Sequence, residues 1–221
     1  PIRMLDFGCG DGAFTAALLD HAAWLPARLQ LALVEPDDVY RQQAVARLQV
    51  YTTQPVRAWS ALPAHLRSCF DLVLANHVLY FVPDLDSTLA ALRGTLAIPG
   101  LFLTAMAGQR STFAQWCQQF FAWLEQPYPF HSAEDLRDVL ARQQVEYTRE
   151  DVHYELVFPD AVEHRLMVMR FLLGHAYHDL SQPALLALFD PYVQNGQVAM
   201  RLVHEHFIMR RHAAGGTTHQ T

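Results

Sequence analysis

The stretch MLDFGCGDGAF, residues 4–14, decides the fold. An apolar run ends at Asp6, glycines then follow at alternate positions from Gly8 to Gly12, and a helix-length segment comes next. Glycine is needed where the backbone turns with a positive φ and where a ligand must approach more closely than a Cβ permits. The pattern therefore predicts a strand over residues 2–8, a tight ligand-binding loop, and a helix to about residue 21.

Strands and helices alternate through the rest of the first half. Strands are expected at residues 28–35, 50–56, 70–76 and 101–107, and helices at residues 37–48 and 84–96. Asp37 is expected to cap the first of these helices, and Pro99–Gly100 to break the chain before the strand at 101–107. Alternation at this spacing predicts βαβ crossovers and a parallel sheet.

The second half is richer in helices. Helices are expected at residues 111–124, 132–144, 159–174 and 182–193, and strands at residues 146–158 and 198–210. The predicted fold is α/β: a doubly wound, Rossmann-like sheet of seven mostly parallel strands, with a helical insertion before an antiparallel last strand. We expect one domain over residues 1–211, with residues 159–195 as a helical cap. The polar, glycine-containing tail 212–221 is expected to be disordered. Because the first strand starts at Pro1, we also expect a helical segment that normally precedes it to be missing.

Composition narrows the class of function. The chain has 221 residues, a net charge of −6 and 16 basic residues, all of them arginine. This balance argues against a nucleic-acid partner, and the lack of lysine excludes Schiff-base chemistry by a lysine. Its apolar stretches are too short to span a bilayer, and no secretory leader opens the chain. Three widely spaced cysteines fit a reducing compartment, so a cytoplasmic protein is expected. The oligomeric state is not indicated.

Two other kinds of site find no support. His204 and His206 share one face of a strand, and His175 and His178 lie one helical turn apart, but neither pair has a third ligand at a recognisable spacing. We therefore expect no metal. No G-x-S-x-G nucleophile elbow is present, which removes a reason to expect a hydrolase.

The glycine loop alone leaves two cofactors open. Gly8, Gly10 and Ala13 satisfy the G-x-G-x-x-G/A pattern of dinucleotide enzymes. Asp6, however, places a carboxylate beside the loop, which suits a ligand with an ammonium group and repels a pyrophosphate. Glu35, at the end of the second strand, can accept hydrogen bonds from ribose hydroxyls of either ligand.

With these residues, and with the run from Phe70 that ends in Asn76–His77, the sequence resembles the class I S-adenosylmethionine (SAM)-dependent methyltransferases across about residues 2–108. The resemblance implies SAM as cofactor. The glycine loop would surround its methionine part, and Glu35, the acidic residue at the end of the second strand, would bind its ribose. The residues implied to bind SAM are Asp6, Gly8, Cys9, Gly10, Gly12, Phe14, Glu35, Pro36, Trp59, Ser60 and Asn76. Trp59 and Ser60 would lie near the adenine, and Asn76 near the methionine carboxylate or the sulfonium.

Structural roles remain open for several of these residues. Gly8 and Gly12 could serve tight strand-to-helix packing, Glu35 could be a carboxylate at a helix start, and Trp59 could be an ordinary packed aromatic. Cys9 is interpreted as a small filler of the loop and not as a nucleophile, because no histidine partner lies near it in sequence.

The segment HVLYFVPDLDSTL, residues 77–89, is similar to histamine N-methyltransferase and its relatives, as are SAEDL (132–136) and FLLG (171–174). This resemblance implies that His77, Tyr80 and Phe81 face the methyl acceptor. An imidazole titrates near neutral pH, so His77 is the best candidate for a base or orienting group, the alternative being a loop histidine bonded to backbone.

Aromatic residues farther along could also contact an acceptor. A stripe of residues at helical spacing is expected to belong to the hydrophobic core. For three further aromatic residues, both a core role and contact with the acceptor remain open. The stripe comprises Phe113, Trp116, Cys117, Phe120, Phe121 and Leu124, and the open positions are Trp123, Tyr128 and Phe130.

The sequence thus predicts a SAM-dependent methyltransferase of a small molecule, with nitrogen of an amine or imidazole as the preferred acceptor. An oxygen acceptor, hydroxyl or carboxylate, is the nearest alternative. A nicotinamide-dependent oxidoreductase and a non-catalytic SAM-binding partner subunit are the alternatives from other classes. No nucleic-acid or membrane partner is expected.

Overall fold

The computed structural model of the protein describes residues 1–212, apart from the side chain of His175. Residues 213–221 of the expected tail lie outside the described residues. The chain forms two compact units: unit 1 holds residues 1–106, 135–150 and 206 onward, and unit 2 holds residues 107–134 and 151–205. Two long strands, β6 (Thr148–Pro159) and β8 (Gln197–Arg211), run through both units. The single domain with a cap at 159–195 stays a prediction.

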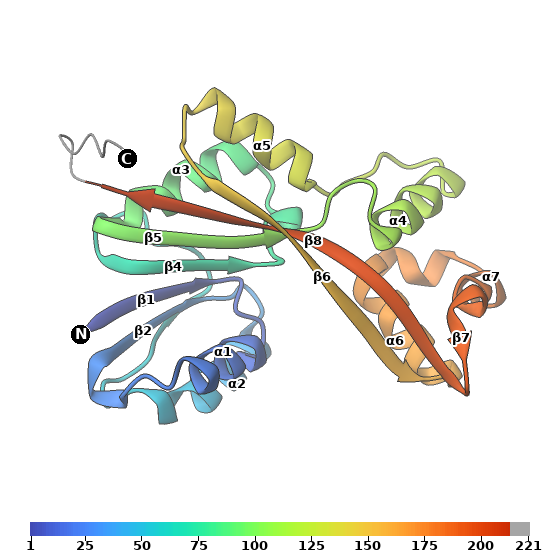
Figure 1. Ribbon diagram of the computed structural model, residues 1–221, viewed down its shortest axis with the longest axis horizontal. Helices are drawn as coiled ribbons and strands as arrows, with labels where there is room; N and C mark the ends of the chain where they lie inside the picture. The colour runs from blue at the N-terminus through green and yellow to red at the C-terminus, as the bar shows by residue number, and fades with distance from the viewer. Residues whose placement is uncertain (213–221) are drawn as a thin grey trace, which may run out of the picture. The chain divides into compact units, whose positions relative to one another are not determined.

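The sheet follows the predicted topology. Its strands in unit 1 are β1 (Ile2–Phe7), β2 (Leu29–Val34), β3 (Arg57–Trp59), β4 (Phe70–Asn76) and β5 (Leu96–Met106). Within residues 1–212 the strand order is β3-β2-β1-β4-β5-β8-β6, and the first five strands in this order are parallel to one another. Figure 1 shows β8 running against β5 and β6. The predicted doubly wound, mostly parallel sheet with an antiparallel last strand is confirmed, and a two-residue strand, β7 (Val193–Gln194), is added beside β8.

The prediction of a strand at residues 50–56 is wrong. Gln49–Tyr51 forms a short 3₁₀ turn, η2, and the strand begins only at Arg57. The intervening backbone is held by side chains: Thr52 Oγ1 donates to the Leu29 carbonyl at 2.6 Å, and Gln49 Nε2 donates to the Gln54 carbonyl at 3.0 Å. Local side-chain bonds of this kind compete with a sheet ladder, and they displace the strand toward the chain's C-terminal side.

The start of β5 also differs from expectation. The strand begins at Leu96 and runs through Pro99–Gly100, which were expected to precede it. Its pairing with β4 shifts register between Phe70 and Leu72. Proline has no N–H to donate to a ladder, so the strand bulges at this position and does not end there.

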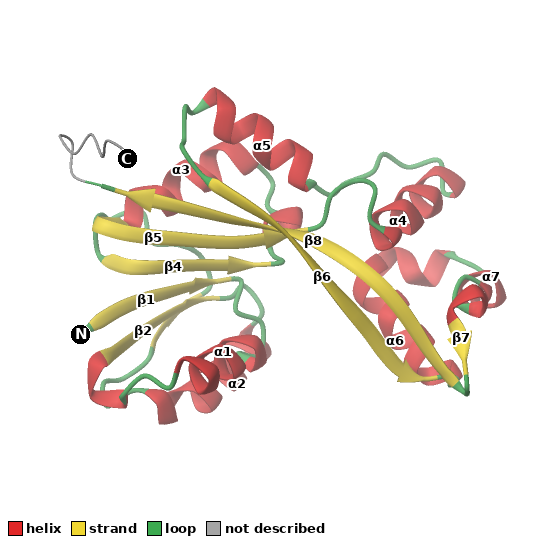
Figure 2. Cartoon of the chain, viewed as in Figure 1, coloured by secondary structure: helices red, strands yellow, loops and turns green. Residues whose placement is uncertain are grey.

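Helices of unit 1 follow the strands as predicted. They are α1 (Ala13–Ala22), α2 (Asp38–Leu48), α3 (Leu85–Thr95) and most of α5 (Ala133–Arg142), with 3₁₀ turns η1 (Pro26–Arg28) and η3 (Leu79–Phe81). Asp37 caps α2 by accepting from the amides of Val39 and Tyr40. In Figure 2, α1 and α2 lie together beside β2, and α3 lies above β5 in this view.

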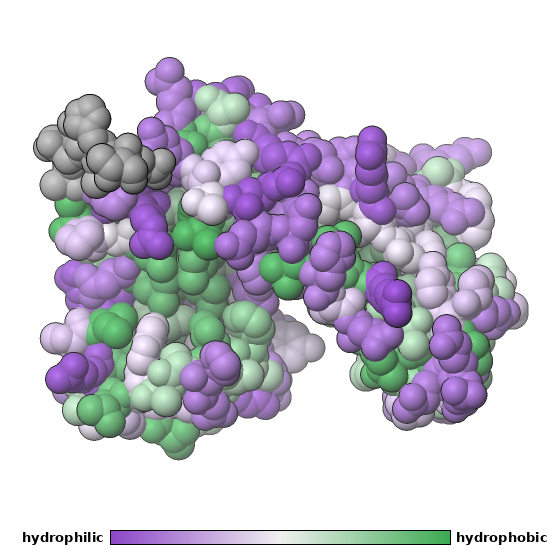
Figure 3. All heavy atoms as spheres, viewed as in Figure 1, coloured by the Kyte–Doolittle hydropathy of each residue, from purple (hydrophilic) through white to green (hydrophobic). Residues whose placement is uncertain are grey.

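Apolar side chains from β1, β2 and α2 close the core of unit 1. Met4, Leu33, Ala44 and Leu48 are all fully buried in one cluster. Figure 3 shows further hydrophobic side chains gathered over β4 and β5 on the face toward the viewer. The near-continuous apolar strands fit a sheet that is covered on both faces.

Unit 2 has its own core. Its helices are α4 (Thr112–Trp123), α6 (Val162–Leu173) and the shorter α7 (Gln182–Ala187), with 3₁₀ turns η4 (Gly174–Asp179) and η5 (Asp190–Tyr192). Trp116, Cys117 and Phe120 are buried in it, and Phe121 is buried as well, so these members of the expected stripe are core. The helix expected to reach residue 193 ends at Ala187, and η5 contains Pro191, which cannot donate a helical hydrogen bond.

Candidate active site

The glycine loop leaves β1 at the carboxyl ends of the parallel strands, where doubly wound sheets hold ligands. Gly8, Gly10 and Gly12 adopt positive φ angles of 73°, 54° and 79°. The Gly8 amide donates to the Val34 carbonyl at 2.7 Å, and the Gly12 amide donates to the Cys9 carbonyl at 3.0 Å. The loop is therefore fixed both to the end of β2 and to itself.

The three loop glycines have different surroundings. A Cβ on Gly8 would lie 2.1 Å from Val78 Cγ2, and one on Gly12 would lie 3.1 Å from Ala44 Cα. A Cβ on Gly10 would meet no heavy atom within 4 Å. Close packing thus explains glycine at two positions, whereas Gly10 faces open space that a ligand can fill.

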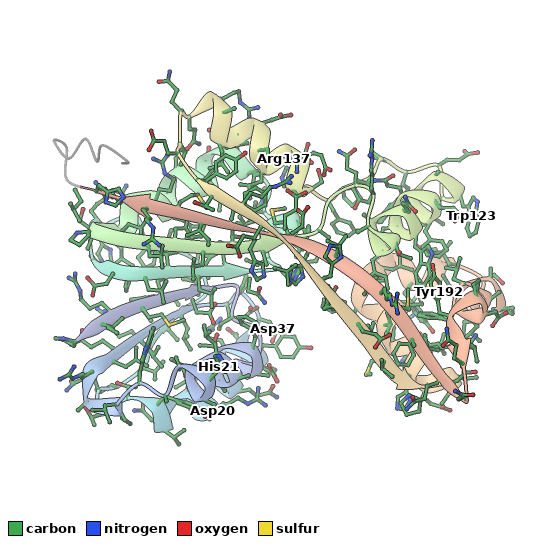
Figure 4. The ribbon with its side chains drawn as sticks, viewed as in Figure 1. Asp20, His21, Asp37, Trp123, Arg137 and Tyr192 are labelled. Atoms are coloured by element: carbon green, nitrogen blue, oxygen red, sulfur yellow. The ribbon has the colours of Figure 1, made fainter. Side chains whose placement is uncertain are left out.

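Glu35 lies directly beside the loop. Its Oε2 accepts from the Gly10 amide at 3.0 Å, and its Oε1 accepts from the Asp37 amide at 3.0 Å. Arg41 Nη1 donates to the Glu35 carbonyl at 2.7 Å. Asp37, labelled in Figure 4, stands at the start of α2 immediately after this residue. The carboxylate is thus held between the glycine loop and the first turn of a helix.

Asp6 lies beneath the loop and is 3% exposed. Its Oδ2 accepts a hydrogen bond from Thr15 Oγ1, which lies in α1. Burial raises the pKa of Asp6 to about 7, the Thr15 bond opposes this shift, and the Glu35 charge adds to it. The site therefore concentrates negative charge that a cationic ligand would relieve.

Cys9 is buried within the loop. Burial, and then the charges of Asp6 and Glu35, raise the pKa of its thiol above the ordinary value. A thiol whose pKa is raised is a poor nucleophile at neutral pH. The surroundings of Cys9 fit a filler of the loop.

The other residues predicted to bind SAM also stand at this edge of the sheet. Trp59 ends β3 in register with Val34, its carbonyl accepts from the Glu35 amide at 3.0 Å, and the Arg57 guanidinium lies 5.8 Å from the centre of its indole ring. Asn76 ends β4 in register with Ala105. Phe14, in the first turn of α1, is 50% exposed, and both Pro36 and Ser60 are exposed.

The predicted acceptor residues form a second group after β4. His77 has a φ of 52°, and its amide donates to the Ala105 carbonyl at 3.1 Å. His77 Nδ1 lies 2.9 Å from the Tyr80 hydroxyl, and the two rings stack with centroids 6.0 Å apart. The Phe81 ring meets Tyr80 edge-on at 5.8 Å and is 55% exposed. The structure thus brings all three side chains into one aromatic group.

Trp123, Tyr128 and Phe130, left open by the sequence, belong to unit 2. Tyr128 and Phe130 meet edge-on at 5.5 Å, and Trp123 is 52% exposed at the end of α4, as labelled in Figure 4. Within residues 1–212, no three His, Cys, Asp or Glu side chains are grouped to hold a metal ion.

Sequence reasoning missed two residues that hold the loop, Thr15 and Arg47. Thr15 binds Asp6, while Arg47 in α2 binds Asp11 at the tip of the loop. A hydroxyl one turn into the helix was a weak local signal for Thr15. Arg47 carried none, because it lies 36 residues from Asp11 along the chain.

Comparison with protein families decides the class. Residues 1–150 match the family model described as a methyltransferase domain. The chain belongs to this methyltransferase family. It is an enzyme with S-adenosylmethionine as methyl donor, and the open, acidic glycine loop fits that cation-bearing nucleoside. The nicotinamide oxidoreductase and the non-catalytic subunit are thereby set aside. A search of curated proteins finds no match to the chain.

Solved structures share the fold at low identity. A candidate methyltransferase from Bacillus halodurans is 12% identical, with a TM-score of 0.63 over 96% of this chain and 93% of the other. A possible histamine N-methyltransferase from Thermotoga maritima is 15% identical, with a TM-score of 0.54 over 94% and 81%. Geranyl diphosphate C-methyltransferase from Streptomyces coelicolor, in complex with S-adenosyl-L-homocysteine, is 12% identical, with a TM-score of 0.54 over 96% and 70%. These likenesses concern the methyltransferase fold alone.

Proposed function

We propose that this methyltransferase transfers its methyl group to a nitrogen, of an amine or an imidazole, in a small molecule. The observation that carries the proposal is the pairing of His77 Nδ1 with the Tyr80 hydroxyl at 2.9 Å, directly after β4. Asn76 is the last residue of β4, and the pairing puts a titratable imidazole and two aromatic rings immediately after it.

The residues that hold SAM in this proposal are those predicted from the sequence. Gly10 leaves room for the ligand, Glu35 takes the ribose hydroxyls, and Asp6 supplies negative charge for the ammonium end. Trp59 would lie beside the adenine. When bound, SAM supplies a methyl group on a sulfonium, which a nucleophile can displace directly.

The acceptor must be positioned and must be neutral to react. In the proposed tautomer, His77 Nδ1–H donates to the Tyr80 oxygen, and Nε2 takes the proton from a protonated acceptor. An imidazole does this well because its pKa is near working pH. The faces of Tyr80 and Phe81 attract a cationic amine before it loses that proton. Holding the nitrogen in line is worth roughly 7–11 kcal/mol of the barrier in favourable cases.

A small acceptor fits the rest of the molecule. The net charge of −6 does not favour a nucleic acid. Among the described residues, no helix is long and apolar enough to cross a membrane. All three cysteines are free thiols, which is usual in a reducing compartment, and we place the enzyme in the cytoplasm on that basis.

The test is a panel of small acceptors incubated with the full chain and SAM, followed by mass spectrometry of the products. The panel contains primary and secondary amines, imidazoles, phenols and carboxylic acids of similar size. Addition of one methyl group to nitrogen, lost in His77→Asn, supports the proposal. Methylation of oxygen or carbon alone would refute the nitrogen acceptor.

A further inference from the structure

We propose that Arg47 is a positioning residue for the methyl donor: it holds the tip of the glycine loop through Asp11 and thereby sets the affinity for SAM. The inference rests on the proposed cofactor site. It goes beyond that site because neither Arg47 nor Asp11 is among the residues proposed to bind SAM. Arg47 lies in the last turn of α2, the helix that begins shortly after Glu35.

The contact between the two residues is double. Arg47 Nη1 lies 2.6 Å from the Asp11 carbonyl oxygen and 2.6 Å from Asp11 Oδ2. The other carboxylate oxygen, Oδ1, accepts from the Ala13 amide at 3.0 Å, at the start of α1. The hydrogen bond from Arg47 holds the pKa of Asp11 below its ordinary value. One guanidinium thus fixes both the backbone and the side chain of the loop tip.

The loop tip needs such a partner. Asp11 stands between Gly10 and Gly12, both with positive φ, and glycine loses more conformational freedom on ordering than any other residue. The Val34 carbonyl of β2 accepts from the amides of Gly8 and Cys9, and the Glu35 carboxylate accepts from that of Gly10, but neither group reaches Asp11 at the tip. A loop that must be ordered when the ligand binds lowers affinity, so an existing restraint raises it.

The same helix restrains the other half of the site. Arg41, in the first half of α2, donates to the carbonyls of Glu35 and Pro36 at 2.7 and 3.2 Å. Arg47, in its last turn, binds Asp11, and Ala44 between them packs on Gly12. Helix α2 therefore fixes the loop tip relative to the carboxylate proposed to bind the ribose.

A second ion pair serves as a matched control. Arg3 and Asp71 lie 2.6 Å apart, with side chains 39% and 33% exposed, against 40% and 39% for Arg47 and Asp11. Arg3 is near the start of β1 and Asp71 near the start of β4, so this pair stands at the amino ends of the strands, away from the glycine loop. Both pairs join an arginine to an aspartate of similar exposure. The Arg3–Asp71 pair connects β1 to β4, whereas the Arg47–Asp11 pair connects α2 to the glycine loop.

The experiment compares Arg47→Gln, Arg47→Lys and Arg3→Gln in the full chain. Isothermal titration calorimetry measures the Kd of S-adenosylhomocysteine, and thermal unfolding measures Tm. We expect Arg47→Gln to raise the Kd about threefold to tenfold, and Arg3→Gln to change it by less than about twofold. Arg47→Lys, which keeps the charge, should recover part of the loss. Hydrogen exchange of the free protein should be faster at Gly12 and Ala13 in Arg47→Gln only.

Two results would overturn the inference while leaving the proposed function standing. One is that wild type binds S-adenosylhomocysteine and the Arg47→Gln variant binds it with the same affinity. The other is an equal loss of affinity in Arg47→Gln and Arg3→Gln, which would reflect general destabilisation. A wild-type protein that does not bind S-adenosylhomocysteine would instead refute the proposed cofactor site, and with it this inference.

Discussion

Glu35 Oε2 accepts a hydrogen bond from the Gly10 amide at 3.0 Å, which joins the end of β2 to the loop glycine that faces open space. The second oxygen, Oε1, accepts from the Asp37 amide. Each carboxylate oxygen therefore has a backbone partner before any ligand binds. The contact places the acid proposed for the ribose within reach of the loop proposed for the methionine part.

Glu35→Gln should weaken the binding of S-adenosylhomocysteine by roughly tenfold, because an amide nitrogen cannot replace an accepting oxygen and a bond to a charged group contributes about 1.5–3 kcal/mol. Calorimetry measures the Kd. Glu163→Gln, an exposed acid at the start of α6, serves as the control and should leave it unchanged. An unchanged Kd in Glu35→Gln would contradict the assignment of Glu35.

Gly8→Ala should destabilise the fold strongly. The new methyl group would lie 2.1 Å from Val78 Cγ2, and the backbone φ of 73° already disfavours alanine. Overpacking together with the left-handed conformation costs roughly 2–4 kcal/mol. Denaturant unfolding at equilibrium measures this loss. A variant with wild-type stability would show that the loop moves freely away from Val78.

Gly10→Ala is expected to behave differently. Because its Cβ would meet no protein atom within 4 Å, the loss of stability should be limited to the backbone term, about 1–2 kcal/mol. The methyl group would instead occupy space left for the ligand. We expect the Kd of S-adenosylhomocysteine to rise well beyond what the stability loss explains. Equal affinity in Gly10→Ala and wild type would place the ligand elsewhere.

The opening of the fold could be predicted because every local signal agreed. Residues 4–14 combine a buried strand, alternating glycines and a helix start, and β1 and α1 follow these bounds closely. His77, Tyr80 and Phe81 were likewise predictable as a group, since they lie within five consecutive residues and a 3₁₀ turn brings them together. Features set by neighbouring residues were accessible to sequence reasoning.

Features set by distant contacts were not accessible. The strand expected at residues 50–56 gave way to a turn held by Thr52 and the Leu29 carbonyl, a bond across 23 positions. Arg47 reaches Asp11 across 36 positions from a helix with little apolar patterning. Such pairings depend on how helices pack onto the sheet, and single-sequence patterns carry no information about them.

Asp6 should make stability depend on pH. Its pKa in the folded protein is about 7, above the ordinary value of 3.8, so the folded state binds the proton more tightly than the unfolded state does. This contribution to stability is full below about pH 4 and is lost as the pH rises through about 7. Asp6→Asn, which cannot ionise, should therefore have a higher Tm than wild type at about pH 8 and a similar Tm near pH 4. Parallel Tm curves for the two proteins would contradict the buried, protonated carboxyl.

The same group should make SAM binding depend on pH in the opposite sense. A cation bound beside Asp6 favours the ionised carboxylate, so affinity should rise as the pH increases through about 7. Binding in that range should release a proton, which calorimetry in buffers of different ionisation enthalpy detects. Asp6→Asn should bind SAM more weakly at high pH and show no such rise. Proton release that persists in Asp6→Asn would assign the titration to another group.

His77→Asn should reduce turnover without weakening SAM binding. Asparagine tolerates the left-handed φ of 52° at this position, so the backbone is retained while the imidazole is removed. Loss of a general base costs roughly 10²–10⁴-fold in rate. Tyr80→Phe removes only the hydroxyl that lies 2.9 Å from Nδ1, and it should lower kcat less and shift the acidic limb of the pH profile. If both variants instead lose SAM affinity in proportion to kcat, His77 and Tyr80 serve the cofactor, and the acceptor must be bound by other residues.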